Sequence, residues 1–345
     1  MPHLTRRAML RTLAGSTLVP AAAMMPRLAL GETQKDVVAA AQKEGKLVFW
    51  GAEEVPKIRR LAQKFAKQYP GIEFEQFRIE PGPAIQRIIS EHDAGQSNVD
   101  IFDSPVSYLD PILERDLVAR YDWNGVFGVA EDHIYYDGRA LACFNLEVPI
   151  CCNTAKVKPG DVKSWEDLLD PKWKGQVLLE ARGAALAVLA TKWGVDKTVD
   201  YIKKLKANDP VIMIGGSPTA EALASGRVAL AIGTYVGKID LMKQDGAPVD
   251  WLLVSPVTAM VYMMLVTKEA KHPNAARLFT AWLTTAEGQA ALYEELHYGF
   301  AAGSNLSPNG IKMRDAHVEV WQETTDPKTD RKLLETVAAA IGALK

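Results

Sequence analysis

Cysteine and histidine are scarce in this sequence, which limits the metal chemistry that it can support. Its 345 residues include only three cysteines and six histidines. Cys143, Cys151 and Cys152 form no Cys-x-x-Cys pair, and no histidine accompanies them at the spacing of a zinc site, so a structural zinc centre is not predicted. The cysteines leave two alternatives open: one disulfide between Cys143 and either neighbour, or buried free thiols.

The sequence also lacks the motifs of common enzyme classes. It contains no Gly-x-Ser-x-Gly nucleophile elbow and no His-Glu-x-x-His zinc motif. The segment 233–238 ends in Gly-Lys, but it lacks the spacing and the following Ser or Thr of a phosphate-binding P-loop. His92 falls on an apolar helical face, where we expect a residue at the rim of the core. Asp93, Asp100 and Asp103 show no arrangement into acid and base roles. We therefore expect a protein that is not an enzyme and that carries no cofactor or resident metal.

Neither charge nor apolar residues accumulate enough to indicate a nucleic-acid-binding or polytopic membrane protein. The chain carries 40 basic and 42 acidic residues, and 48% of it is hydrophobic. Four arginines precede the first acidic residue, Glu32, so the chain from residue 32 onward holds 36 basic and 42 acidic residues, a formal charge of −6. A mildly acidic body is poorly suited to neutralising phosphate backbones, and we expect no nucleic-acid partner.

What the N-terminus does contain is the pattern of an export signal at residues 1–31. Arg6 and Arg7 stand before an apolar run of small residues, 12–25, which is too short to span a bilayer stably. Ala29-Leu30-Gly31 then offers a small-x-small cleavage site. The paired arginines indicate the twin-arginine route, which carries folded proteins, so we expect a periplasmic protein that begins near Glu32. A short anchor that stays uncleaved is the alternative.

The twin-arginine assignment gives the first testable prediction. Replacing both Arg6 and Arg7 with lysine should leave the precursor in the cytoplasm, because that route reads the arginine pair. Cell fractionation of the variant and the parent, followed by immunoblotting, measures the result. Undiminished delivery of the variant to the periplasm would contradict the assignment.

From residue 33 onward, apolar strands alternate with amphipathic helices. A helix is expected from Thr33 to Glu44, stopped by Gly45. Strands are expected at 46–50, 99–102, 177–179, 211–214, 228–232 and 251–254. This alternation predicts open α/β sheets with helices on both faces, arranged as two α/β units of which the second is inserted into the first.

Several segments resemble, in the right order, one protein family. These segments are Cys152-Asn153-Thr154, Ser164–Gly175 (SWEDLLDPKWKG), Ala224–Ile232, Gly246–Val249 and His272–Gln289. Together they are similar to the extracellular solute-binding proteins of ABC importers, family 1, in the group that contains the ferric-iron binders. Each segment alone is weakly specific, but the ordered set spans most of residues 45–295. Cys152 departs from the family, which commonly has a tyrosine before Asn-Thr.

The resemblance implies an α/β, two-lobed periplasmic-binding-protein fold (type II-like), in which each lobe is an open mixed sheet flanked by helices. We place lobe one at 32–152 plus 255–345 and lobe two at 153–254, joined by hinge strands at 151–154 and 254–257. The resemblance further implies a monomer that captures a small solute as the lobes close and delivers it to the membrane permease of an ABC importer. A periplasmic enzyme or a solute sensor is the alternative of another class.

Ligands of open α/β sheets bind beyond the carboxyl ends of the strands, and this rule selects the candidate residues. The resulting ligand-binding candidates are Trp50, Ala52, Glu53, Ser104, Arg182, Gly183, Gly216, Ser217 and Tyr235. Ser104 is also expected to cap a helix led by Pro105. For Trp50, a place in the core is the alternative.

Two of these positions favour an anionic ligand. Arg182-Gly183 and Gly216-Ser217 combine a helix start with a cation or a hydroxyl, which suits a carboxylate, phosphonate or phosphate. A solvated surface charge at Arg182 and a plain helix cap at Ser217 are the alternatives. We expect a small organic anion as the ligand.

Ferric iron as the transported ligand is the alternative to an organic anion. Fe(III) requires anionic oxygen ligands such as phenolates and carboxylates. Resemblance to the iron binders implies two adjacent tyrosines in the loop at 233–237, but here Tyr235 is followed by Val236. The pair Tyr135-Tyr136 does not align with that motif. Tyr235 is therefore the residue that would hold the metal if iron is the ligand.

Overall fold

The structure is a computed structural model that describes residues 31–303 and 305–342. The predicted export signal lies outside the described residues, apart from Gly31. Within the described part of the chain, no helix combines the length and the apolar character needed to cross a membrane.

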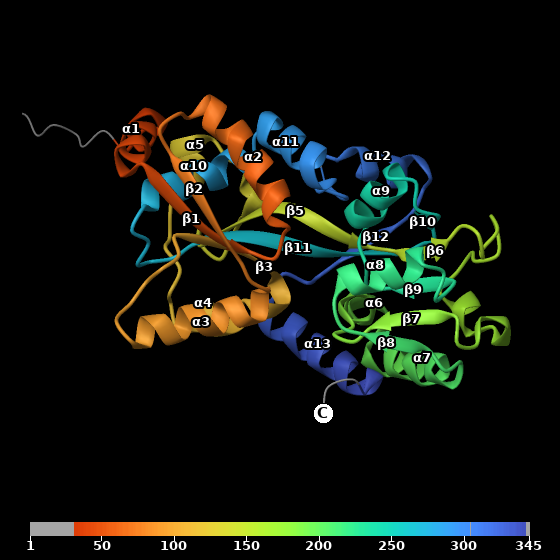
Figure 1. The fold of residues 1–345 in the computed structure, drawn as a ribbon. Helices are drawn as coiled ribbons and strands as arrows, with labels where there is room; N and C mark the ends of the chain where they lie inside the picture. The colour runs from red at the N-terminus through yellow and green to blue at the C-terminus, as the bar shows by residue number, and fades with distance from the viewer. Residues whose placement is uncertain (1–30, 304, 343–345) are drawn as a thin grey trace, which may run out of the picture. The chain divides into compact units, whose positions relative to one another are not determined.

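A mixed sheet of seven strands forms the first half of the fold (Figure 1). Its strands are β1 (Lys46–Gly51), β2 (Glu73–Arg78), β3 (Ile101–Pro105), β4 (Ile134–Tyr135), β5 (Ala140–Val148), β11 (Val257–Val266) and β12 (Val320–Gln322). They follow the order β2-β1-β3-β11-β5-β4, and β12 pairs with β11. β1 is parallel to β2 and β3, whereas β11 runs antiparallel to both β3 and β5. The late strand β11 therefore lies in the middle of a sheet begun by the first hundred residues.

Helices cover both faces of this sheet, as Figure 1 shows. One face carries α1 (Gln34–Glu44), α2 (Val55–Gln68), α10 (Pro273–Leu283) and α11 (Ala286–Leu296), which bury side chains such as Phe65 and Phe279. The other face carries α3 (Pro81–Asp93), the short η1 (Val106–Tyr108) and α4 (Asp110–Glu114), which pack on Trp50 and Phe102. The sequence alternates between these two cores because successive strand residues point to opposite faces.

A second mixed sheet has five strands and its own helical cover. Its strands are β6 (Ile150–Asn153), β7 (Val177–Glu180), β8 (Val211–Met213), β9 (Leu230–Ile232) and β10 (Val249–Trp251), in the order β10-β6-β9-β7-β8. The helices α6 (Ala184–Trp193) and α7 (Val195–Ala207) pack on one face, and α8 (Gly216–Ala224) and α9 (Val236–Gln244) on the other. The short helices η3 (Glu166–Leu169) and η4 (Pro171–Trp173) bury Leu168 and Trp173 beside α7.

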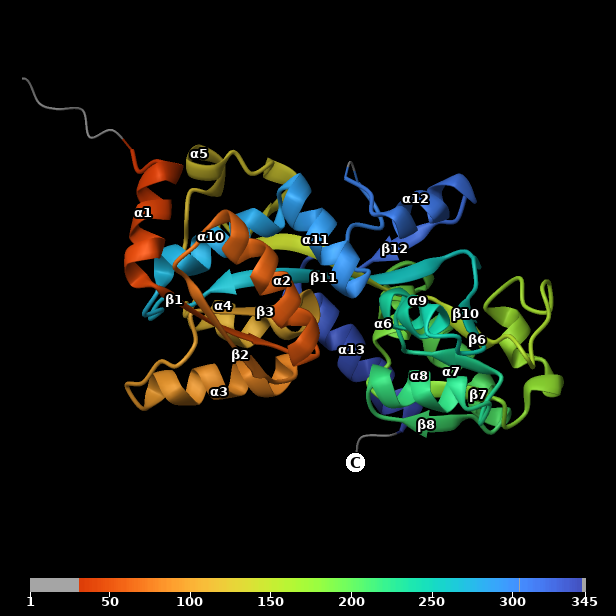
Figure 2. The same cartoon turned by 45° about the horizontal axis from the view of Figure 1, so that its top comes forward.

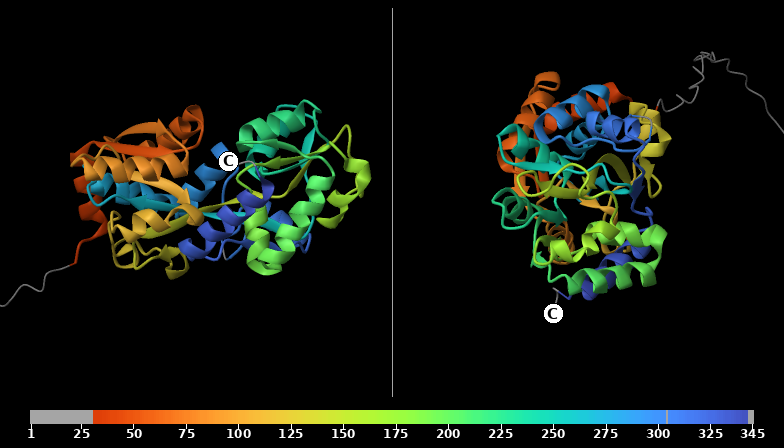
Figure 3. Two further views of the ribbon diagram at one scale, coloured as in Figure 1. Left: turned by 90° about the horizontal axis from the view of Figure 1, so that it is seen from below. Right: turned by 90° about the vertical axis from the view of Figure 1, so that its right-hand side faces the viewer.

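The chain passes between the two sheets more than once. It leaves the first sheet after β5, enters the second at β6, and returns from β10 into β11. It ends in α13 (Pro327–Ile341), which packs against η1 and α4 as well as against α6 and α7. Figures 2 and 3 place α13 where the elements of the two sheets meet. The remaining helices are α5 (Trp123–Phe127), η2 (Glu131–His133) and α12 (Pro308–Asp315).

The predicted fold class is confirmed: two mixed sheets, each flanked by helices, make up the described chain. The lobe and hinge boundaries stay a prediction. Two observations concern residues that the prediction assigns to lobe one. Cys151 and Cys152 pair with β9 and β10 in the second sheet, and α13 contributes Val337 and Ile341 to the core of that sheet. All three cysteines are buried free thiols, with Cys143 in the first sheet and Cys151 and Cys152 in the second.

Candidate functional site

A cleft of about 370 Å³ is lined by residues from both sheets and is the candidate ligand site. That volume lies within the range of small-molecule pockets, which is roughly 300–1,000 Å³. Its lining comes mainly from loops that follow β1, β2, β7, β8 and β9, together with residues of β5 and β11. The lining residues used below are Ala52, Glu53, Arg78, Glu80, Tyr108, Glu180, Arg182, Gly216, Ser217, Tyr235, Tyr262 and Tyr298. Most of these loops follow the carboxyl ends of strands, which is where the sequence analysis locates its ligand-binding candidates.

The structure brings most of the candidate residues together at this cleft. Ala52, Glu53, Arg182, Ser217 and Tyr235 line it, and so does Gly216. Gly216 is close to Tyr235, because a Cβ atom at Gly216 would stand 2.6 Å from the tyrosine Cε1. Glycine at this position therefore lets the Tyr235 ring approach the start of α8. Which of these residues contact a ligand stays a prediction.

Trp50 and Ser104 do not line the cleft, because both side chains point into the core. Trp50 is 2% exposed and belongs to the core beneath α3, where the Arg87 guanidinium lies 4.6 Å from its ring centroid. The expected cap at Ser104 is wrong: Ser104 lies inside β3, is fully buried, and donates its hydroxyl hydrogen bond to the Pro105 carbonyl at 3.0 Å. β3 continues to Pro105, and the helical turn begins only at Val106. Both side chains point into the core because a strand alternates its faces.

Gly183 serves the packing of α13 and not the cleft. Its φ of 71° lies in the left-handed region, and a Cβ atom there would meet Val337 Cγ1 at 2.6 Å. Its backbone N–H donates to the Glu180 carbonyl at 3.1 Å. This N–H is therefore not free for a ligand, although Gly183 does stand at the start of α6, as the sequence analysis expects.

Arg182 is held between two carboxylates and is not a solvated surface charge. Its Nε donates to Glu180 Oε1 at 2.8 Å, and its Nη1 donates to Glu80 Oε2 at 2.9 Å. The Glu180 side chain is 6% exposed, whereas the Glu80 side chain is 54% exposed. Glu180 is also fixed by the backbone N–H groups of Arg182 and Gly215, at 3.0 and 2.9 Å. Glu180 therefore orients the guanidinium from behind, and Glu80 contacts its outer edge.

Helix N-termini add positive potential to the cleft. Helices α6 and α8 begin at lining residues, α9 begins directly after the lining residue Tyr235, and none of the three has a side-chain cap. The uncapped first turn of a helix carries unpaired N–H groups and a partial positive charge, which favours anions. Arg78 adds a second guanidinium, whose Nε donates to the Ala52 carbonyl at 2.9 Å. Arg78 and these helix starts surround the same cleft as Arg182.

Two buried carboxyl groups, Glu53 and Asp103, meet beside the cleft. Burial raises the pKa of Glu53, and burial together with the neighbouring Glu53 raises the pKa of Asp103 well above its usual range. Among the described residues, the buried oxygens Glu53 Oε2 and Asp103 Oδ1 have no hydrogen-bond partner. Two acids so close disfavour each other's ionisation, which adds to the effect of burial on the pKa of Asp103. The raised pKa values of both groups oppose the build-up of negative charge beside the cleft.

Tyrosines are the residues that the sequence analysis missed. Tyr108, Tyr262 and Tyr298 join Tyr235 at the cleft, from η1, β11 and the loop after α11. Burial, with a smaller contribution from the nearby Glu53, raises the pKa of Tyr235 to about 12, and a hydrogen bond with Ser217 offsets part of this shift. Burial also raises the pKa of Tyr262 and Tyr298. No local signal marks these tyrosines, because they are far apart in sequence and meet only in the fold.

The described residues contain no cluster of three or more His, Cys, Asp or Glu side chains that could hold a metal. The pair Tyr135-Tyr136 lies away from the cleft lining, and the Tyr136 hydroxyl donates to the Thr325 carbonyl at 3.0 Å. The anionic oxygen groups that the cleft offers to an iron ion are the tyrosine phenolates and the carboxylates of Glu53, Glu80 and Glu180.

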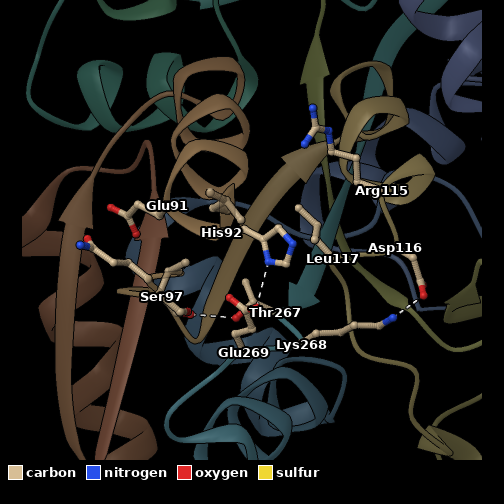
Figure 4. Close-up of a pocket in the computed structure, with 12 residues that line it drawn as sticks. Glu91, His92, Ser97, Arg115, Asp116, Leu117, Thr267, Lys268 and Glu269 are labelled. Atoms are coloured by element: carbon tan, nitrogen blue, oxygen red, sulfur yellow. Dashed lines mark hydrogen bonds and ion pairs between the residues drawn. The ribbon is translucent and has the colours of Figure 1, made fainter. Parts of the chain in front are cut away.

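A second hollow, of about 230 Å³, lies at the C-terminal end of α3 (Figure 4). Its charged side chains are engaged with one another. His92 Nδ1 lies 2.9 Å from Glu269 Oε1, and Lys268 forms an ion pair with Asp116. Arg115 at its rim pairs with Asp93 at 3.1 Å. None of the ligand candidates lines it, so it is best described as a network of surface ion pairs.

Comparison with known proteins bears on what such a cleft does. The model of the family described as "Bacterial extracellular solute-binding protein" matches residues 60–313. An uncharacterised protein of Haemophilus influenzae is 30% identical over 142 residues, which are 39% of this chain and 40% of that protein. Iron uptake protein A1 of Synechocystis is 33% identical over 110 residues, which are 28% of this chain and 29% of that protein. The chain thus spans less than half the length of each of these relatives.

Solved structures share the fold at low sequence identity. Iron-bound HitA of Pseudomonas aeruginosa superimposes with a TM-score of 0.71 at 18% identity, covering 87% of this chain and 99% of HitA. The substrate-binding protein of an Agrobacterium tumefaciens ABC transporter gives 0.72 at 17% identity, with 86% and 94% covered. AfuA of Actinobacillus pleuropneumoniae with fructose-6-phosphate gives 0.65 at 19% identity, with 86% and 96% covered. Structures of this one fold therefore include both an iron-bound and a sugar-phosphate-bound protein.

Proposed function

We propose, on the premise that the chain belongs to the family of bacterial extracellular solute-binding proteins, that its cleft captures a small organic anion. A carboxylate or a phosphate- or phosphonate-bearing molecule fits the site. The observation that carries the proposal is the convergence of Arg78, Arg182 and the uncapped starts of α6, α8 and α9 around one cleft. As a member of this family the chain is a binding protein and not an enzyme.

The physical argument concerns charge and size. A guanidinium offers a planar set of donors that matches a carboxylate or phosphate, and removal of water strengthens the pairing. The raised pKa of Asp103 limits the opposing negative charge. A space of about 370 Å³ holds an organic molecule and is far larger than a bare metal ion requires.

The transport role rests on the family and on its structural relatives. We propose that the protein works in the periplasm as a monomer and hands its ligand to the membrane permease of an ABC importer. The similar Agrobacterium tumefaciens structure, described as the substrate-binding protein of an ABC transporter, supports this role. The ligand would be enclosed as the parts of the chain on either side of the cleft approach each other.

Ferric iron is the second candidate, and the cleft tyrosines favour it. Phenolates and carboxylates suit Fe(III), and Tyr235, Tyr262, Tyr298 and Glu53 line one cleft. The matches to Iron uptake protein A1 and to iron-bound HitA point the same way. Against it, the raised pKa values mean that each phenol must give up its proton at a cost, which the metal would have to offset.

Native mass spectrometry of the purified protein tests the choice, because a bound organic acid and a bound iron ion differ in mass. We expect an organic anion. Tyr235→Phe is the matched variant, since it removes only the hydroxyl: it should reduce anion affinity by less than about tenfold, the net worth of one neutral hydrogen bond. Iron in the parent, together with loss of Fe(III) binding in Tyr235→Phe, would replace the anion proposal with the iron one.

A further inference from the structure

The two carboxylates on Arg182 differ in how firmly they are held. Glu180 is buried, accepts two backbone N–H groups besides the guanidinium Nε, and belongs to the same strand end as Arg182. The Glu80 carboxylate has a single partner among the described residues, Arg182 Nη1, and its side chain is 54% exposed. It stands at the N-cap position of α3 but makes no cap hydrogen bond. One partner is therefore fixed and the other is free to leave.

The Glu80 carboxylate occupies the place that a ligand carboxylate would take. It approaches the outer edge of the guanidinium from the first sheet's side of the cleft, and both residues line that cleft. The chemistry of this contact, a carboxylate oxygen 2.9 Å from a guanidinium nitrogen, is the one proposed for the ligand. An anion that pairs with Nη1 must therefore first displace Glu80.

We infer that Glu80 is an internal competitor that sets the affinity of the cleft for anions. Glu180 keeps the guanidinium oriented while Glu80 exchanges with the ligand. This inference rests on the proposed function and adds to it a residue that lowers affinity, where the other charged residues raise it.

A second ion pair, between Lys238 and Glu54, also joins the two sides of the cleft. Lys238 of α9 donates to Glu54 at the start of α2, with Nζ 2.8 Å from Oε1. Lys238 holds the pKa of Glu54 at about 2, so this pair persists at neutral pH. Removal of Glu80 should consequently free Arg182 without opening this second contact.

The test compares Glu80→Gln with the parent and with Glu75→Gln. Glu75 is on the same edge of the first sheet and has a similarly exposed side chain, 56%, paired with Lys46. Glu75→Gln changes the net charge by the same amount as Glu80→Gln, but Glu75 does not line the cleft. Two measurements are made on each protein: the rate at which phenylglyoxal modifies Arg182, followed by peptide mass spectrometry, and the calorimetric affinity for citrate and for inorganic phosphate.

We expect faster labelling of Arg182 and about two- to fivefold tighter binding of at least one anion in Glu80→Gln only, the range that an exposed ion pair supports. Equal labelling in all three proteins would overturn the inference whatever ligand the cleft takes. Faster labelling without tighter anion binding would overturn the competitor role, even though the contact is exchangeable. Failure of the proposed function is visible separately, as iron in the parent by native mass spectrometry.

Discussion

Arg182→Ala should weaken binding of the organic anion at least tenfold. Truncating one partner of a buried, hydrogen-bonded charge pair typically costs about 2–5 kcal/mol, or roughly thirtyfold to several thousandfold in affinity. Isothermal titration calorimetry with the anion released from the purified protein measures the change. Binding equal to that of the parent would show that the anion lies elsewhere, and would favour iron if Tyr235→Phe then lost all binding.

The same substitution should also lower the stability of the ligand-free protein. A solvated arginine could be removed at little cost, but Arg182 is the cationic partner of Glu180, whose side chain is 6% exposed. Loss of the guanidinium leaves a buried carboxylate with backbone donors only, which is unfavourable. Arg182→Lys is the control: it keeps the charge but not the planar pair of donors, so its affinity should fall between those of the parent and the alanine variant.

Glu147→Gln should stabilise the protein by several kcal/mol at pH 8, because the native state disfavours the ionised carboxylate. Glu147 on β5 is 1% exposed, and its Oε1 has no hydrogen-bond partner in the part of the chain that the structure describes. Burial, with a smaller contribution from Asp240, raises its pKa from 4.5 to about 8. One pKa unit corresponds to about 1.4 kcal/mol, so a shift of this size makes a large contribution.

The sign of the pH dependence follows from proton binding. Between pH 4.5 and about 8 the folded protein keeps the Glu147 proton and the unfolded chain loses it. The free energy of unfolding is therefore higher at low pH and falls as pH rises through that window. Glu323, whose pKa burial raises to about 7, adds a decline of the same sign.

Thermal unfolding between pH 5 and pH 8.5 measures this prediction. The melting temperature of the parent should fall across the range, and that of Glu147→Gln should fall less. Glu75→Gln, which removes an exposed carboxylate on β2, is the control and should follow the parent. A parallel decline in the parent and in Glu147→Gln would mean that Glu147 is not protonated in the native state.

The sequence determined the alternating elements and the strand ends at which the candidate cleft lies. Gly45 ends α1 in the left-handed conformation, as expected for a glycine after a helix. The loops after β1, β7, β8 and β9 were predictable as the lining of a cleft because parallel strands present their carboxyl ends at one edge of a sheet. Each of these features is determined by the order of neighbouring residues in one short segment, so it can be predicted from the sequence.

The tertiary structure alone decided which side chains reach the cleft and what they meet there. Trp50 and Ser104 occupy strand positions that face the core, and strand rotation is not visible in a short apolar run. Glu80 lies 102 residues from Arg182 in sequence, and no local pattern pairs them. Tyr262 joins Tyr235 because β11 inserts between β3 and β5 in the first sheet. Contacts between distant segments depend on the order of strands in the sheet, and that order is settled by packing of the whole chain and not by the residues of any one segment.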